Sequence, residues 1–227
     1  MNVIRFPPPE QPVPPAEPFL NIPPATRIFV AAFLLVHGAL VFWAPASLHN
    51  AIIVRFSFIP AQYTGFLPFA PEALIAPLAY NFLHGSWAHV LLNSAMMAAF
   101  GSGMERALGA PRMILLFFVS SLCAALTHLA LYPGSTTPVI GASGGVSGLF
   151  AGALLMFFAQ GRQDEAARRS FAVLVLVWVV VSVVFGLMEA PGGGTVAWAA
   201  HIGGFLGGLV LFKAITGQKN RGNIRKP

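Results

Sequence analysis

The amino-acid sequence is a series of apolar runs, each long enough to cross a lipid bilayer. About 20 residues of α-helix span the roughly 30 Å of hydrocarbon in a bilayer. Hydrophobic residues make up 56% of the chain and charged residues only 9%, which excludes an ordinary soluble domain. The sequence predicts an all-α membrane protein, a bundle of six transmembrane helices. We place these helices at 26–45, 87–106, 111–132, 143–160, 170–188 and 197–216.

The basic residues are distributed very unevenly about such a bundle. With six crossings both termini lie on one side, and Arg55 is the single basic residue on the other. The remaining twelve are Arg5, Arg27, Arg106, Arg112, Arg162, Arg168, Arg169, Lys213, Lys219, Arg221, Arg225 and Lys226. Because basic residues favour the cytoplasmic side, we predict that both termini are cytoplasmic. The net charge of +6 is then explained by the orientation of the helices in the membrane, so we expect no nucleic-acid partner.

Three further segments flank or interrupt the bundle domain, which we place at 26–216. Residues 1–25 hold nine of the 19 prolines, so the backbone lacks the donors that a helix needs, and we predict a disordered cytoplasmic tail. Residues 217–227 form a short basic tail. Segment 46–86 is too apolar for an aqueous loop and too often interrupted for a span. We expect it to lie in the outer membrane interface.

Ser143 is the candidate nucleophile. Gly141, Gly144 and Gly145 surround it and permit a sharp turn into the helix that follows. The start of that helix offers free N–H groups and a positive dipole end, which suit a developing oxyanion. The five residues also match the G-x-S-x-G pattern of soluble hydrolases, but that turn needs a preceding strand, so we reject the soluble fold. Ser147 is a rival nucleophile, although its deeper position favours helix packing.

His201 is the candidate general base, since a buried neutral imidazole can accept a hydroxyl proton. Gly204 and Gly208 lie on its helical face, and Gly144 and Gly148 form a similar small face on the helix that begins at Ser143. Small residues let two membrane helices approach closely. We therefore expect these four glycines to pack together and to bring Ser143 within hydrogen-bonding distance of His201.

His89 and Asn93 are the remaining polar candidates. They are spaced i, i+4, so they share a helical face at the same outer depth as Ser143. Both could donate hydrogen bonds to an oxyanion, although helix packing is an alternative role. A metal site of His84, His89 and His201 is a weaker alternative, because no thiolate or carboxylate joins them, and we predict no metal.

These motifs together resemble the rhomboid family of intramembrane serine proteases, in order and in approximate spacing. The matching segments are Phe82-Leu83-His84, His89-Val90-Leu91-Leu92-Asn93, Gly101 to Glu105 with Gly109, Gly141-Ala142-Ser143-Gly144, and Ala200-His201-Ile202-Gly203-Gly204. Two features depart from the family pattern. Ser147 stands where an aromatic residue often stacks on the histidine, for which Trp198 or Phe205 is a substitute, and a Trp-Arg pair is missing near Ile75.

The resemblance implies a six-helix rhomboid-like bundle with a Ser143–His201 catalytic dyad. It also implies oxyanion donors from His89, Asn93 and the Ser143 amide, transmembrane proteins as substrates, the lipid bilayer as surroundings, and no cofactor. The oligomeric state stays unknown. A rhomboid-like protein that binds or chaperones transmembrane helices without cutting them is the alternative function. The compact bundle and the charge bias predict a bacterial inner membrane.

Overall fold

The computed structural model describes residues 21–160, 165–187, 189–190, 194–195 and 198–223. The prediction of a disordered tail falls mostly on residues 1–20, outside this range, as do residues 224–227 and most of the Gly192–Gly194 link. Within the described residues the protein is helical, apart from one antiparallel pair of two-residue strands, β1 (Glu189–Ala190) and β2 (Gly194–Thr195).

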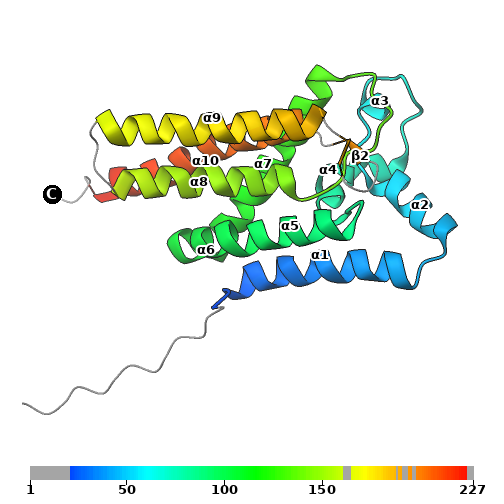
Figure 1. The fold of residues 1–227 in the computed structure, drawn as a ribbon, viewed down its shortest axis with the longest axis horizontal. Helices are drawn as coiled ribbons and strands as arrows, with labels where there is room; N and C mark the ends of the chain where they lie inside the picture. Colours follow the sequence, from blue (N-terminus) through cyan, green and yellow to red (C-terminus); the bar gives the residue numbers. More distant parts are fainter. Residues whose placement is uncertain (1–20, 161–164, 188, 191–193, 196–197, 224–227) are drawn as a thin grey trace, which may run out of the picture.

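Long helices cover every apolar run that the sequence predicts (Figure 1). They are α1 (Pro24–Phe42), the continuous series α5 (Trp87–Met96), η3 (Met97–Gly101) and α6 (Ser102–Leu108), then α7 (Ala110–Leu131), α8 (Ser143–Gln160), α9 (Glu165–Leu187) and α10 (Trp198–Asn223). η3 is a π-helical turn, a distortion often found near functional sites. The last helix continues to Asn223, whereas the sequence analysis ends it at 216.

The hydropathy of these helices suits a bilayer. Among the described residues, α1, α7 and the part of α10 from Trp198 to Gly217 are long and apolar enough to span a membrane. Ser143–Phe158 of α8 is a shorter apolar helix. The prediction of a helical membrane protein is therefore confirmed, whereas the number of crossings stays a prediction.

The Glu105 side chain of α6 caps the first turn of α1. The Glu105 carboxylate accepts hydrogen bonds from the backbone N–H groups of Ala25 and Thr26, at 3.0 and 2.7 Å, and from the Thr26 hydroxyl at 2.7 Å. These are groups of the first turn of α1, whose N–H groups lack partners within the helix. Pro24 suits the first position because its missing N–H is not needed there. Glu105 thus joins α1 to the rest of the bundle.

Segment 46–86 folds into short helices at one end of the bundle, on the right in Figure 1. They are α2 (Ala46–Phe56), α3 (Pro60–Tyr63), η1 (Pro71–Leu74), α4 (Ala76–Ala79) and η2 (Tyr80–Phe82). Phe58 and Val139 exchange two backbone hydrogen bonds of 3.0 and 2.9 Å, so this segment is paired with the loop that leads into α8.

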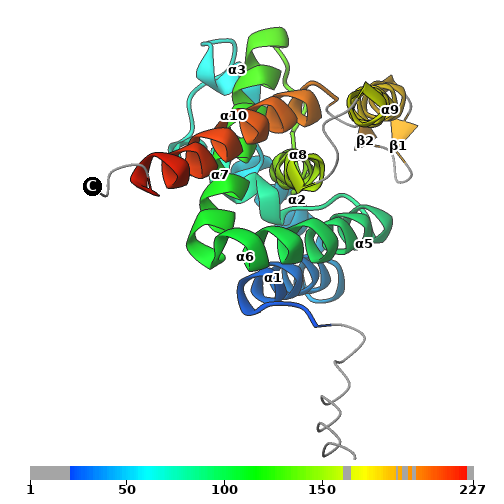
Figure 2. The same ribbon diagram turned by 90° about the vertical axis from the view of Figure 1, so that its left-hand side faces the viewer.

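Helix α8 lies at the centre of the bundle, with α10, α7, α5 and α9 around it (Figure 2). The largest apolar core joins side chains of α1, α5, α7, α8 and α10, with Phe33, Met113, Leu116, Phe117 and Leu149 fully buried. Such burial is expected for a helix whose apolar residues occupy every face. The start of α8, with Ser143, is therefore held by neighbours on several sides.

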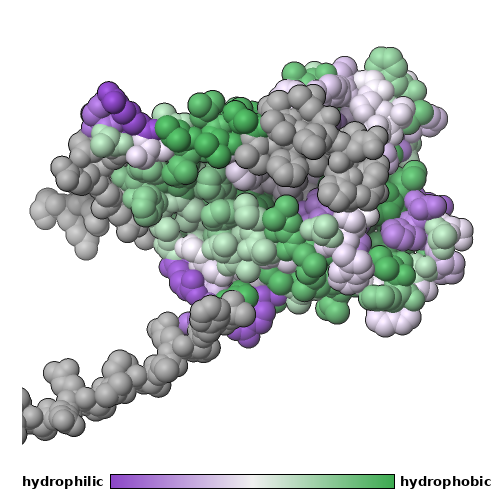
Figure 3. All heavy atoms as spheres, in the orientation of Figure 1, coloured by the Kyte–Doolittle hydropathy of each residue, from purple (hydrophilic) through white to green (hydrophobic). Residues whose placement is uncertain are grey.

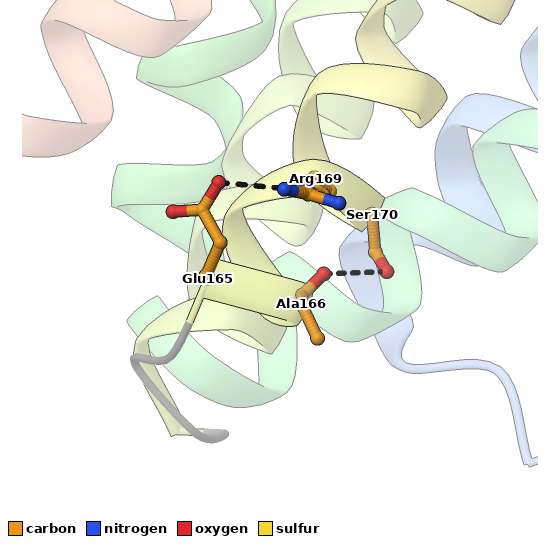
Figure 4. A network of polar contacts seen from close by, with 4 residues as sticks. All are labelled: Glu165, Ala166, Arg169 and Ser170. Carbon is orange, nitrogen blue, oxygen red and sulfur yellow. Dashed lines mark hydrogen bonds and ion pairs between the residues drawn. The ribbon is translucent and has the colours of Figure 1, made fainter.

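The surface carries an apolar band between more polar ends (Figure 3). Large apolar side chains are exposed on several helices, including Leu35, Leu91, Leu126, Leu176 and Val210. Polar groups gather at the start of α9, where the Arg169 Nε donates to Glu165 at 3.2 Å and the Ser170 hydroxyl donates to the Ala166 carbonyl at 3.0 Å (Figure 4). This exposed ion pair contributes only a few tenths of a kcal/mol, about 0.3–0.5. Its main relevance is to mark a water-facing end of the bundle.

Candidate active site

A glycine turn places Ser143 at the start of α8. Gly141 has a φ of 109°, a conformation that residues with a side chain rarely adopt, and its N–H donates to the Tyr80 carbonyl at 2.9 Å. Two residues later α8 begins at Ser143. The N–H groups of its first turn have no partner within the helix, because the first internal bond runs from Val146 to Ala142. The Ser143 side chain therefore stands beside free backbone donors.

Ser143 and His201 form a hydrogen bond across two helices. The Ser143 Oγ lies 2.9 Å from the His201 Nε2, within the range of a good hydrogen bond. Both residues are half-buried, and His201 sits in the first turn of α10. A neutral imidazole in this position can accept the hydroxyl proton. This geometry would suit a nucleophile and its base.

Glycines make this approach possible. A Cβ on Gly204 would clash with the carbonyl oxygen of Gly144, and a Cβ on Gly208 would clash with the backbone of Gly148. α8 and α10 thus touch backbone to backbone at two levels, the first beside Ser143 and the second about one turn deeper. All four glycines that the sequence analysis assigns to this packing lie in the α8–α10 contact.

His89 and Asn93 lie on the other side of the glycine turn. A Cβ built on Gly141 would be 2.6 Å from the His89 Nε2 and 3.6 Å from the Asn93 Nδ2, so both side chains face the backbone just before Ser143. Asn93 is buried and His89 half-buried. Two side chains that can donate hydrogen bonds therefore lie against the turn that leads into the start of α8.

The hydroxyl of Ser147, the rival candidate for the nucleophile, is bonded within its own helix. Its hydroxyl donates to the Ser143 carbonyl at 2.6 Å, a bond back to the preceding turn of the same helix, and the residue is fully buried. The aromatic neighbour of the His201 ring is Trp178 of α9, with ring centroids 6.5 Å apart. Trp198 instead donates to the Tyr132 hydroxyl at 3.0 Å, and Phe205 packs near Phe150, with ring centroids 5.9 Å apart.

Tyr80 is a site residue that the sequence analysis misses. Its carbonyl holds the Gly141 N–H, while its hydroxyl donates to the Ser121 carbonyl at 2.9 Å and lies beside Gly144. The Ser121 hydroxyl in turn lies 2.7 Å from the Asn81 Oδ1. Tyr80 thus braces the chain on both sides of Ser143. No sequence signal could have found it, because its role depends on the fold of the segment 46–86.

A metal ion has no cluster of ligands here. Within the described ranges, no group of three histidine, cysteine or carboxylate side chains is arranged to hold one. The rings of His84 and His89 do meet, with centroids 5.1 Å apart, but at 77° to one another. The chemistry that the site offers comes from its hydroxyl, imidazole and amide groups.

The fold is that of a helical membrane protein in which a serine and a histidine form a hydrogen bond between two helices packed through glycines. This combination is typical of intramembrane serine proteases. Residues 72–218 match the model of the Rhomboid domain. The chain therefore belongs to the rhomboid family. This match covers the site and every long helix except α1.

Three curated relatives support the family assignment. The chain is 37% identical to RHOMBOID-like protein 4 of Arabidopsis thaliana over 134 residues, which are 59% of the chain and 32% of the relative. It is 36% identical to Rhomboid-like protease 5 of Toxoplasma gondii over 130 residues, 57% of the chain and 15% of the relative. It is 25% identical to Rhomboid protease GluP of Bacillus subtilis over 142 residues, 63% of the chain and 25% of the relative. The matched part spans a third or less of these relatives.

Proposed function

We propose that this protein is an intramembrane serine endopeptidase that cleaves the transmembrane segments of other membrane proteins. The observation that carries the proposal is the 2.9 Å hydrogen bond between the Ser143 Oγ and the His201 Nε2. Membership of a family with relatives named proteases supports it. Substrate and enzyme would meet within the lipid bilayer, and no cofactor is required.

The proposed reaction has two halves. The Ser143 Oγ attacks the peptide carbonyl while His201 takes its proton, and the oxyanion is held by the Ser143 N–H, His89 and Asn93. His201 then gives the proton to the leaving amine, which leaves an ester on Ser143. Water, deprotonated by His201, attacks this ester and restores the serine. Each oxyanion donor would contribute on the order of 3 kcal/mol to the barrier reduction.

We further propose that the bundle crosses the membrane six times, with both termini in the cytoplasm and residues 26–216 as the protease domain. The start of α1, the end of α6, the start of α9 and the end of α10 lie at one end of the bundle (Figure 1), and most basic residues of the described part of the chain belong to these segments. The site lies toward the opposite end, near the segment 46–86. The relatives come from a plant, Toxoplasma and Bacillus, so the bacterial inner membrane rests on the sequence analysis alone.

A substrate helix must reach Ser143 from the side, and α9 is the proposed gate. This helix packs against α8 and α10 and exposes Val173, Leu176 and Val180. Its inner face approaches the site through Trp178, whose ring centroid lies 6.5 Å from that of His201 and 4.8 Å from that of Phe150. A crosslink that ties α9 to α5 should stop the cleavage of transmembrane substrates but leave a small fluorophosphonate free to label Ser143. Unchanged turnover in the crosslinked protein would rule out the gate.

The function is tested with purified protein in lipid vesicles, a fluorophosphonate probe and a panel of transmembrane substrates. Wild-type protein and Ser147→Ala should label and cleave, whereas Ser143→Ala and His201→Ala should do neither. Labelling that survives Ser143→Ala and vanishes in Ser147→Ala would reassign the nucleophile. If wild-type protein neither labels nor cleaves but captures transmembrane helices, the non-cleaving function is correct instead.

A further inference from the structure

A histidine in α1 contacts the loop that precedes the oxyanion donors. His37 is 2% exposed, and its Nδ1 lies 3.1 Å from the backbone carbonyl of His84. It lies outside residues 72–218, which match the family model, and the proposed reaction does not use it. A buried imidazole in a membrane helix is costly unless it has a role, so this contact calls for an explanation.

The contact determines which ring nitrogen of His37 carries the hydrogen. A carbonyl oxygen only accepts hydrogen bonds, so the Nδ1 must carry the hydrogen, and in the neutral ring the Nε2 is then an acceptor. That Nε2 is buried and has no hydrogen-bond partner among the described residues. The ring itself is held by Trp87, whose centroid lies 4.8 Å away at an angle of 86°. His37 therefore has one strong polar contact, and it is made to the chain just before α5.

From that carbonyl the contacts lead directly to the proposed oxyanion site. The His84 side chain is 1% exposed, and its ring packs 5.1 Å from the His89 ring and 5.5 Å from the Phe33 ring of α1. Neither nitrogen of the His84 ring makes a hydrogen bond of standard geometry in the described part of the chain, so packing is the main contact that orients it. His89 in turn faces Gly141 through its Nε2. The ring of His89 is thus supported through His84, and the position of His84 depends on α1.

We propose that His37 is a positioning residue, whose hydrogen bond to the His84 backbone sets the orientation of His89 toward the site. The inference rests on the proposed function. A displacement of about 1 Å in a catalytic group can cost roughly a hundredfold in rate. Loss of the His37 donor should therefore lower kcat between about tenfold and a hundredfold and leave KM nearly unchanged.

Substitutions of His37 by Asn, Gln and Leu separate the effect of the Nδ1 donor from the effect of the size of the ring. The amide nitrogen of Asn stands near the place of Nδ1, whereas that of Gln stands near Nε2. His37→Asn should keep most of the wild-type kcat, while His37→Gln and His37→Leu should lose it. Leu40→Ala, which empties another buried position of α1, is the control for general destabilisation and should lower the melting temperature without the loss in kcat.

A double-mutant cycle tests whether His37 acts through His89. If it does, His37→Leu should reduce kcat in the wild-type protein but have little further effect in the His89→Ala background. Equal losses in both backgrounds, or a His37→Asn protein as slow as His37→Leu, would overturn the proposal.

A spectroscopic measurement keeps the inference separate from the proposed function. In protein with ¹⁵N-labelled histidine, the His89 ring signals, identified by their loss in His89→Ala, should move in His37→Leu and stay in place in His37→Asn. Wild-type protein without any cleavage or labelling would contradict the protease, and the ring signals would still decide the role of His37. Ring signals that are identical in all His37 variants would overturn the positioning role even in an active enzyme.

Discussion

Gly204 of α10 lies directly against the carbonyl oxygen of Gly144 in α8, so no side chain fits between the two helices at this point. Ser143 precedes Gly144 by one residue, and His201 precedes Gly204 by three. The separation of the two backbones here sets the distance between the Ser143 hydroxyl and the His201 ring. The proposed catalytic geometry and the helix packing therefore depend on the same contact.

Gly204→Val should abolish activity by forcing α8 and α10 apart. The new side chain meets backbone rather than a flexible side-chain end, so the helices themselves must move. We expect fluorophosphonate labelling to fall at least about a hundredfold, because a shift of about 1 Å in the reacting groups can cost that much. Gly217→Val in the same helix is the matched control, since a Cβ there meets nothing within 4 Å. Labelling at the wild-type rate in Gly204→Val would show that this contact does not hold the dyad.

Gly141→Ala should impair the oxyanion site while Ser143 and His201 remain. The residue has a φ of 109°, and its new Cβ would lie 2.6 Å from the His89 Nε2, so either the turn or the donor must shift. We expect kcat to fall by roughly 10²–10³, as when one oxyanion donor is removed, with a smaller change in KM. Gly65→Ala shares a positive φ of 83° but meets nothing within 4 Å. Gly65→Ala therefore introduces backbone strain alone and should leave kcat unchanged. A loss of kcat seen only in Gly141→Ala would come from the clash with His89.

Glu105→Ala should loosen α1. Glu105 is 8% exposed, and its carboxylate accepts three hydrogen bonds from Ala25 and Thr26, so its loss leaves backbone donors of the first turn unpaired. Loss of a helix cap costs typically about 1 kcal/mol, and buried charged partners raise this toward about 3 kcal/mol. Thermal unfolding in detergent measures the effect. Glu72→Ala is the comparison, because its contact with Arg55 is 3.9 Å long and only partly buried. A melting temperature that falls equally in both variants would contradict the capping role.

Tyr63 should make the segment 46–86 sensitive to strongly alkaline pH. Burial raises the pKa of Tyr63 to about 12, and its hydroxyl donates to the Ala73 carbonyl at 2.6 Å. An unfolded tyrosine has a pKa of about 10, so the stabilising effect is complete below pH of about 10 and is lost as the pH rises toward 12. Melting temperatures across this range should fall more steeply in wild-type protein than in Tyr63→Phe. Parallel curves for the two proteins would show that Tyr63 does not carry the effect.

The long helices were predictable because length and hydropathy decide them locally. α8 begins at Ser143 and ends at Gln160, as the sequence predicts, since a glycine turn and a polar segment delimit an apolar run. The proximity of Ser143 and His201 was predictable for the same reason, because small residues recur at helical spacing on both partners. The extent of α10 was not, since its last turns are polar and hydropathy gives no sign that the helix continues.

The groups that hold the site in place could not be predicted. Tyr80 and Trp178 act through contacts that depend on how the short helices and α9 fold against the bundle. Neither carries a local sequence signal, and a single tyrosine or tryptophan near a membrane interface has many common roles. The same holds for His37, whose partner lies 47 residues away in the chain. Sequence periodicity shows which face a residue occupies but not which distant backbone atom that face meets.

The two backbone hydrogen bonds between Phe58 and Val139 join the segment 46–86 to the loop that delivers Gly141 and Ser143. A thinner or thicker bilayer that raises or lowers these short helices must move that loop with them. If the protein is the proposed protease, lipid composition would then act as an effector, changing the rate of peptide hydrolysis with no ligand bound at Ser143 or His201.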